Sequence, residues 1–213
     1  MTAGSHTRRW LIVIAATAAA IGGGVVGRHY WQTEPPPKIG GYVLSKPRTL
    51  PPVALVDEQG RAFRPADFAG RWSFLYFGYT YCPDVCPLTL VELAMLKKSL
   101  AEQLPDTPTD YYLVSVDPGR DTPERLREYV TYFDASFHGL TGSIDDLKSL
   151  TQQTGSVFFV PDHQSDDGYL VSHSSNIALV DPEGRLAAVF TSPHEPARLA
   201  ADFGLIVAYR ARR

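Results

Sequence analysis

The sequence predicts an α/β domain in which a central mixed β-sheet is flanked by helices. Two observations support this prediction. Short, nearly uninterrupted apolar runs are typical of strands buried on both faces, and other segments repeat apolar residues at helical spacing. Strands and helices alternate in the first part of the domain, and three strands then precede a last helix. This order favours a sheet covered by helices on both faces.

Strands are predicted where apolar and aromatic runs lie between turn residues. The runs Trp72–Phe77 and Tyr111–Val116 are expected to be buried on both faces. A tight turn with the sequence Asp-Pro-Glu-Gly, at 181–184, joins the last two strands. The remaining predicted strands are 54–56 and 62–63, which form a small hairpin, and 157–160, 176–180 and 185–190.

Helices are predicted from apolar spacing and from residues that favour helix ends. Ser and Thr side chains cap helix N-termini, Pro fits the first helical position, and Gly favours the C-terminal end. The predicted helices are Leu90–Leu104, which Pro105 ends, a helix capped by Thr122, a helix capped by Ser143 and ended by Gly155, and a helix from about Pro196.

An uncharged, mostly apolar run occupies residues 10–27. As a helix its 18 residues would measure about 27 Å, close to the roughly 30 Å hydrocarbon core of a bilayer. Because the run continues past small residues where a signal peptide could be cleaved, a transmembrane anchor is favoured over a signal segment. Arg8 and Arg9 precede the run, which predicts a cytoplasmic N-terminus at 1–9. The domain is then expected on the periplasmic side of the inner membrane.

A Pro/Gly-rich linker is predicted at 28–52, and the folded domain at 53–213. The net charge of −3 and the 20% of charged residues are those of an ordinary globular domain. This composition does not indicate a nucleic-acid partner.

The chain has two cysteines, four positions apart, in the stretch YTYCPDVCPLTL. Cys82 follows a predicted buried strand, and Cys86 lies at or near the first turn of the next helix. A helix N-terminus lowers a thiol's pKa and favours the thiolate. A disulfide here would close a very short loop and add little stability. A redox pair and a metal site therefore remain the two main interpretations.

A metal site would need a third donor, because two thiolates leave most metals under-coordinated. Among the six histidines, His138 and His163 are expected in exposed loops. His173 stands just ahead of a predicted buried strand, and strand ends are where α/β sheets assemble their sites. A lone histidine is more often structural, so its position alone does not identify a ligand.

Four motifs together resemble the Sco/SenC family. They are FGYTYCPDVCP at 77–87, VSVDPGRDTPERL at 114–126, GLTGS at 139–143 and VSHSSNIALVDPEGRL at 171–186. They occur in the family's order, and the resemblance extends from about Val53 to Phe203. It implies a thioredoxin-like fold, with an N-terminal membrane anchor and an exported domain.

The resemblance implies that copper is held by Cys82, Cys86 and His173, and that the two cysteines can form a redox-active disulfide. It links Asp117 to the integrity of the copper site or to partner docking, although capping the turn after its strand explains this residue equally well. Two thiolates and an imidazole suit Cu(I), and Cu(II) is a second candidate.

The implied function is that of a metallochaperone, which delivers copper to the copper-binding subunit of cytochrome c oxidase during assembly. The alternative is a thiol–disulfide oxidoreductase that keeps the copper-ligand cysteines of the oxidase reduced, since both roles need reactive thiols. The spacing of the cysteines and the added histidine favour metal binding over enzymatic reduction. Further expected partners are a copper donor or a thiol reductase.

Overall fold

The computed structural model describes residues 10, 13–20, 22–24, 35–161 and 168–212. The chain divides into two compact units, Met1–Pro35 and Pro36–Arg213. In the first unit, the described residues 10, 13–20 and 22–24 are helical. None of the helices in the described ranges is both long enough and apolar enough to cross a membrane. The predicted cytoplasmic segment 1–9 and part of the predicted anchor 10–27 lie outside those ranges.

The second unit contains a mixed sheet of eight strands in the order β1-β10-β9-β4-β5-β6-β2-β3. Its strands are β1 (Gly41–Thr49), β2 (Leu55–Asp57), β3 (Ala62–Phe63), β4 (Trp72–Gly78), β5 (Thr109–Ser115), β6 (His138–Gly142), β9 (Ile177–Val180) and β10 (Arg185–Phe190). A separate two-stranded ribbon pairs β7 (Phe158–Phe159) with β8 (Ser172–His173). The helices are α2 (Val85–Gln103), α3 (Pro123–Phe133), α4 (Ile144–Gln153) and α5 (Pro196–Ala211), with a 3₁₀ turn at Pro65–Phe68.

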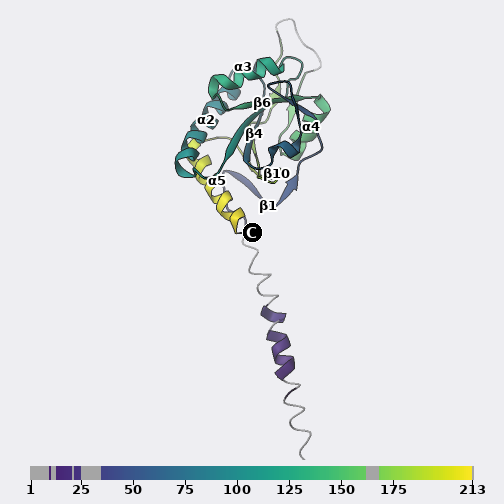
Figure 1. Ribbon diagram of the computed structural model, residues 1–213. Helices are drawn as coiled ribbons and strands as arrows, with labels where there is room; N and C mark the ends of the chain where they lie inside the picture. Colours follow the sequence, from purple (N-terminus) through teal and green to yellow (C-terminus); the bar gives the residue numbers. More distant parts are fainter. Residues whose placement is uncertain (1–9, 11–12, 21, 25–34, 162–167, 213) are drawn as a thin grey trace, which may run out of the picture. The chain divides into compact units, whose positions relative to one another are not determined.

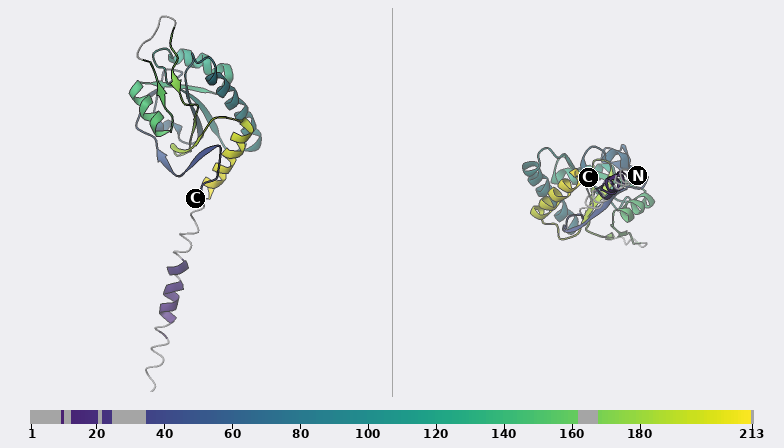
Figure 2. Two further views of the ribbon diagram at one scale, coloured as in Figure 1. Left: turned by 180° about the vertical axis from the view of Figure 1, so that it is seen from behind. Right: turned by 90° about the horizontal axis from the view of Figure 1, so that it is seen from below.

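The helices lie on both sides of the sheet, as the sequence predicts. Helices α2, α3 and α5 follow one side, and α4 lies on the other (Figures 1 and 2). Strands β4, β5 and β6 are parallel and are joined by crossovers through α2 and α3. The other neighbouring strands of the sheet pair antiparallel.

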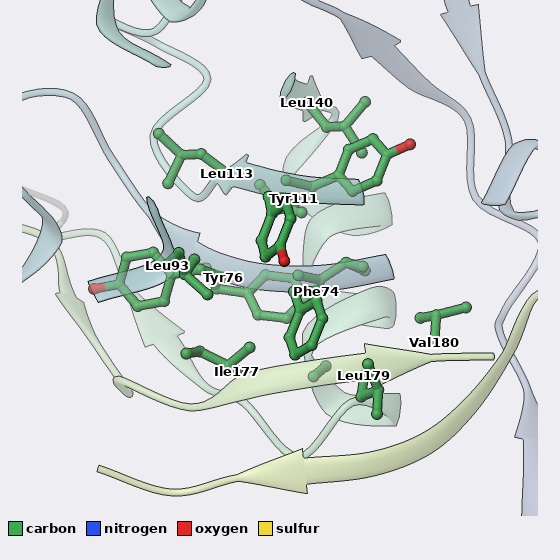
Figure 3. Close-up of a cluster of buried hydrophobic side chains, with 14 of the residues drawn as sticks. Phe74, Tyr76, Leu93, Tyr111, Leu113, Leu140, Ile177, Leu179 and Val180 are labelled. Carbon is green, nitrogen blue, oxygen red and sulfur yellow. The ribbon is translucent and has the colours of Figure 1, made fainter. Parts of the chain in front are cut away.

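The core is centred on β4, in which all seven residues are buried. Phe74 stacks on Tyr111 of β5, with ring centroids 5.2 Å apart, and its ring also lies 5.2 Å from that of Phe203 on α5. Figure 3 shows how side chains of β4, β5 and β9 fill this layer. Apolar burial on both faces explains why β4 reads as a continuous apolar run.

Two predicted helix caps are present. The Thr122 side chain accepts a hydrogen bond from the backbone N–H of Arg125, and Ser143 does the same for Asp146. Gly155, after α4, has a φ of +72°, which L side chains rarely adopt. The residues that begin and end these helices therefore have the roles that their types suggest.

Two strands of the eight-stranded sheet differ from the prediction, and the short strand β8 of the separate ribbon was not predicted either. Strand β1 lies within the predicted linker 28–52 and pairs with β10, so the linker prediction is wrong over 41–49 and the domain begins before Val53. Strand β6 occupies a segment that the sequence placed in a loop, and His138 is its first residue. Its sequence, HGLTG, has two glycines and one large apolar residue, which is a weak strand signal. The strand forms because it pairs with β5 on one side and β2 on the other, although its own residues have a weak preference for the extended conformation.

The strand directions determine where distant segments meet. β9 runs antiparallel to β4, with Ile177 opposite Tyr76. The start of β9 therefore lies beside the end of β4, and the segment before β9 reaches the loop that follows β4. This arrangement brings the histidine of the fourth motif to the cysteines of the first.

Candidate metal centre

The two cysteines follow β4 directly. Gly78 ends the strand, Cys82 is half-buried in the turn after it, and Cys86 is fully buried in the first turn of α2. The backbone N–H of Cys82 donates to the Tyr79 carbonyl at 3.3 Å, which closes the turn. Both cysteines are free thiols. The sequence placed them correctly, at a strand-to-helix turn.

His173 lies 3.3 Å from the thiol of Cys86, measured from Nε2 to Sγ. Its other ring nitrogen, Nδ1, is 3.1 Å from the Ser174 carbonyl. A carbonyl oxygen only accepts, so Nδ1 carries the proton and Nε2 keeps its lone pair directed at Cys86. Fixing the tautomer of a histidine through its second nitrogen is the usual way in which proteins prepare an imidazole ligand.

The donor atoms of Cys82, Cys86 and His173 all lie within 4.8 Å of one another. With bond lengths of about 2.3 Å to sulfur and about 2.0 Å to nitrogen, two ligands of one ion are at most about 4.6 Å apart. Small side-chain movements therefore suffice to bring the three donors onto a single ion. Two sulfurs and one nitrogen form a soft donor set.

Burial controls the protonation of this site. It raises the pKa of the Cys86 thiol well above its ordinary value, although a backbone hydrogen bond involving Tyr79 opposes the shift. The sequence predicted the opposite direction, because the N-terminus of a helix stabilises a thiolate. At Cys86 desolvation outweighs that effect, so the metal-free thiol is protonated and a bound cation would displace its proton.

Burial also keeps His173 neutral. It lowers the pKa of this histidine, and the hydrogen bond to the Ser174 carbonyl opposes the shift only in part. A neutral imidazole is the form that binds metals. Of the donors Cys86 and His173, only Cys86 therefore has to lose a proton when a metal binds.

The space around Cys86 is closely packed. A Cβ atom added at Gly78 would lie 2.9 Å from Cys86 Sγ, 3.0 Å from Tyr76 Cε1 and 3.2 Å from Leu113 Cδ1. The rings of Tyr76 and Tyr79 also approach the His173 imidazole, at 6.1 and 5.8 Å between centroids. The thiol and the imidazole are thus held by neighbouring side chains, and glycine at 78 leaves room for the sulfur.

Asp117 follows β5 in a neighbouring loop, where it is buried. Its backbone carbonyl accepts from the N–H groups of Arg120 and Asp121, so it closes the turn after its strand. Its side chain forms an ion pair with Arg120 and accepts a hydrogen bond from Tyr169, 2.6 Å away. Asp117 is not among the three clustered donors.

The other predicted positions are placed differently. His138 is half-buried and lies 3.1 Å from the Glu58 carboxylate, so its prediction as an exposed loop residue is wrong. His163 lies outside the described residues. His194 is buried, and its Nε2 donates to the Ser175 carbonyl, next to the residue that holds His173. Sequence patterns do not reveal this contact, because its acceptor is a backbone carbonyl.

Comparisons with known proteins agree with this arrangement. A family model described as SCO1/SenC matches residues 44–207. A protein of Stutzerimonas stutzeri, whose name suggests copper binding, is 39% identical over 151 residues, which are 71% of this chain and 73% of that protein. The mitochondrial SCO1 homolog 1 of Arabidopsis thaliana is 33% identical over 144 residues, or 68% of this chain. The crystal structure of Arabidopsis thaliana ScoI with copper bound has a TM-score of 0.68 at 31% identity and covers 76% of this chain and 98% of that one.

The match to the mitochondrial homolog covers 42% of that protein's length. The matched residues include β4, the cysteine loop and the segment that carries His173. The mixed sheet flanked by helices is also that of the copper-bound Arabidopsis structure. On these grounds the chain belongs to the SCO1/SenC family.

Proposed function

We propose that this protein binds copper through Cys82, Cys86 and His173 and delivers it to the copper-binding subunit of cytochrome c oxidase during assembly of that enzyme. The observation that carries the proposal is the convergence of two free thiols and a neutral imidazole within 4.8 Å. Membership of the SCO1/SenC family supports the oxidase as the recipient. The copper-bound Arabidopsis relative supports copper as the metal.

The donor set favours Cu(I) as the cargo. Thiolates select Cu(I) over harder ions, and a three-coordinate site satisfies it, whereas zinc ordinarily takes a fourth ligand. The residues described near the site contribute no fourth His, Cys, Asp or Glu donor to the cluster. A soft site with few ligands also suits transfer, because an incoming thiolate can replace the protein's donors one at a time.

The arrangement is less suited to a thiol–disulfide reductase. A reductant needs an accessible thiolate at its attacking cysteine. Cys86 is buried and burial raises the pKa of its thiol, so the half-buried Cys82 is the one cysteine of the pair with partial access to a disulfide. We therefore place copper delivery first and treat reduction of the oxidase's cysteines as the competing outcome of the test.

The proposed location is the periplasmic side of the inner membrane, with residues 10–27 as an anchor and 1–9 in the cytoplasm. The apolar run and the preceding arginines support this location. Protease added from the periplasmic side should then remove the folded domain from membranes. A soluble mature protein that begins near residue 21 would identify the run as a cleaved signal.

Copper transfer tests the proposal. The reduced full-length protein is titrated anaerobically with Cu(I) and then mixed with the metal-free copper-binding domain of the oxidase subunit. We expect about one tightly held Cu(I) per chain, which moves to the oxidase domain without any change in thiol content. Absence of retained copper, together with reduction of a disulfide in the oxidase domain, would assign the protein to the reductases instead.

A further inference from the structure

Arg120 contacts both segments that supply the metal centre, the cysteine loop and the segment that leads to His173. It stands in the loop between β5 and α3, and its guanidinium carbon is 3.6 Å from the ring centroid of Tyr169 and 4.7 Å from that of Tyr81. Tyr81 immediately precedes Cys82, and Tyr169 stands four residues before His173. One cationic group thus contacts an aromatic ring from the cysteine loop and another from the histidine segment.

The guanidinium is itself fixed in place. Its Nε forms an ion pair with the Asp117 carboxylate, of which the side chain is 1% exposed. The second oxygen of that carboxylate accepts the hydrogen bond from the Tyr169 hydroxyl. Arg120 Nη2 is buried and has no hydrogen-bond acceptor among the described residues. The guanidinium instead lies over the rings of Tyr81 and Tyr169. A planar guanidinium is suited to pairing with a carboxylate and stacking on rings at the same time.

Few other contacts attach the histidine segment to the cysteine loop. Strands β7 and β8 pair over only two residues each. Beyond the Cys86–His173 contact, the Tyr79 ring lies 5.8 Å from the His173 imidazole, and the Val171 N–H donates to the Tyr79 hydroxyl at 3.2 Å. His173 is 87 positions from Cys86 along the chain, so its place in the site depends on such contacts.

We propose that Arg120 is a positioning residue. Held by Asp117 and stacked between Tyr81 and Tyr169, it joins the His173 segment to the cysteine loop and sets the distance between the imidazole and thiol donors. Asp117 and the Tyr169 hydroxyl act through it, as the groups that orient the guanidinium. The consequence for copper rests on the proposed function, whereas the consequence for the metal-free protein does not.

The metal-free full-length protein provides the first test, by hydrogen–deuterium exchange. Arg120→Ala should raise the exchange rate of peptides that span 169–173 by roughly tenfold, the scale expected for losing two cation–π contacts and an ion pair. Arg120→Lys keeps the charge but not the planar stack, so it should rescue little of the protection. Tyr169→Phe keeps the ring and loses the hydrogen bond to Asp117, so its effect should be smaller.

A matched control is available at the opposite end of the sheet. Arg185 also pairs with a buried aspartate, Asp181, which follows the end of β9 that pairs with the start of β4. Arg185→Ala removes a comparable ion pair and should leave exchange at 169–173 at the wild-type rate. Equal exchange in the wild type and Arg120→Ala would overturn the proposal, and so would equal increases in the two arginine variants.

Copper provides the second test. Wild-type protein loaded with Cu(II) should show the charge-transfer absorption of a Cu(II)–thiolate site. Arg120→Ala should shift that band and lose bound copper to a chelator about ten times faster. An unchanged band and off-rate would refute the positioning role. If the wild type shows no copper site while exchange still responds to Arg120→Ala, the proposed function fails and the positioning role stands.

Discussion

Gly78→Ala tests the packing beneath the metal centre. The added methyl group would lie 2.9 Å from Cys86 Sγ, closer than real Cβ atoms come to their neighbours, and 3.0 Å from the Tyr76 ring, closer than most do. The Tyr76 ring is rigid, so the strain must be relieved by moving the strand or by turning the Cys86 thiol away. Overpacking of this kind costs about 1–3 kcal/mol. For a domain of this size each kcal/mol lowers the melting temperature by about 2–4 °C.

We therefore expect Gly78→Ala to melt roughly 2–12 °C below the wild type and to bind Cu(I) more weakly, because the displaced sulfur no longer faces His173. Differential scanning calorimetry and an anaerobic Cu(I) competition titration measure the two effects. Gly204→Ala is the control, since its new Cβ on α5 would meet no atom within 4 Å. This change should raise stability by about 0.5–1 kcal/mol and leave copper binding unchanged. Wild-type stability together with wild-type Cu(I) affinity in Gly78→Ala would refute the packing described here.

Three further predictions concern ligands, pH and redox state. His173→Ala should weaken Cu(I) binding modestly, since two thiolates can still hold this ion, and should abolish stable Cu(II) binding. Titrations with Cu(I) and with Cu(II) measure the two effects. His138→Ala is the control and should bind copper as the wild type does. The His138–Glu58 pair should make the free energy of unfolding depend on pH. The hydrogen bond to Glu58 raises the pKa of His138 above its ordinary 6.5. The stabilisation from protonated His138 is therefore complete below about pH 6.5 and is lost as the pH rises through the raised pKa. Burial alone would raise the pKa of Glu58, but hydrogen bonds, chiefly the one with His138, lower it to about 2. The stabilisation from ionised Glu58 is therefore lost as the pH falls from 4.5 toward 2. Thermal melts between pH 2 and 9 should show both losses, and His138→Ala should remove the alkaline one. Oxidation to a Cys82–Cys86 disulfide should abolish Cu(I) binding, and an equal affinity in oxidised and reduced protein would contradict the two-thiolate site.

The sequence predicts those parts of the fold whose local pattern agrees with their environment. β4 and β5 are buried on both faces and read as apolar runs, and the caps at Thr122 and Ser143 act on their own helices. β6 depends on its neighbours, because its glycines and its single leucine carry no strand pattern of their own. β1 contains Pro47 and follows a proline-rich stretch, and only its pairing with β10 defines it as a strand.

In the metal centre too, some features are visible in the local sequence and others depend on contacts between distant segments. Cys82 and Cys86 are neighbours in sequence, so their joint role is visible from their spacing and from the strand before them. His173 meets them only because β9 runs antiparallel to β4, and a resemblance to known motifs was needed to single it out. The raised pKa of Cys86 and the stacking of Arg120 depend on burial and on contacts between distant loops. Local sequence does not specify either one.

The coordination of bound Cu(I) tests the three-donor site most directly. X-ray absorption spectroscopy of the reduced protein, loaded with one equivalent of Cu(I), counts the sulfur and nitrogen neighbours of the metal. A site formed by Cys82, Cys86 and His173 predicts two sulfurs and one imidazole nitrogen, with the nitrogen lost in His173→Ala and retained in His138→Ala. A spectrum with two sulfurs and no nitrogen in the wild type, or an imidazole that persists in His173→Ala, would contradict it.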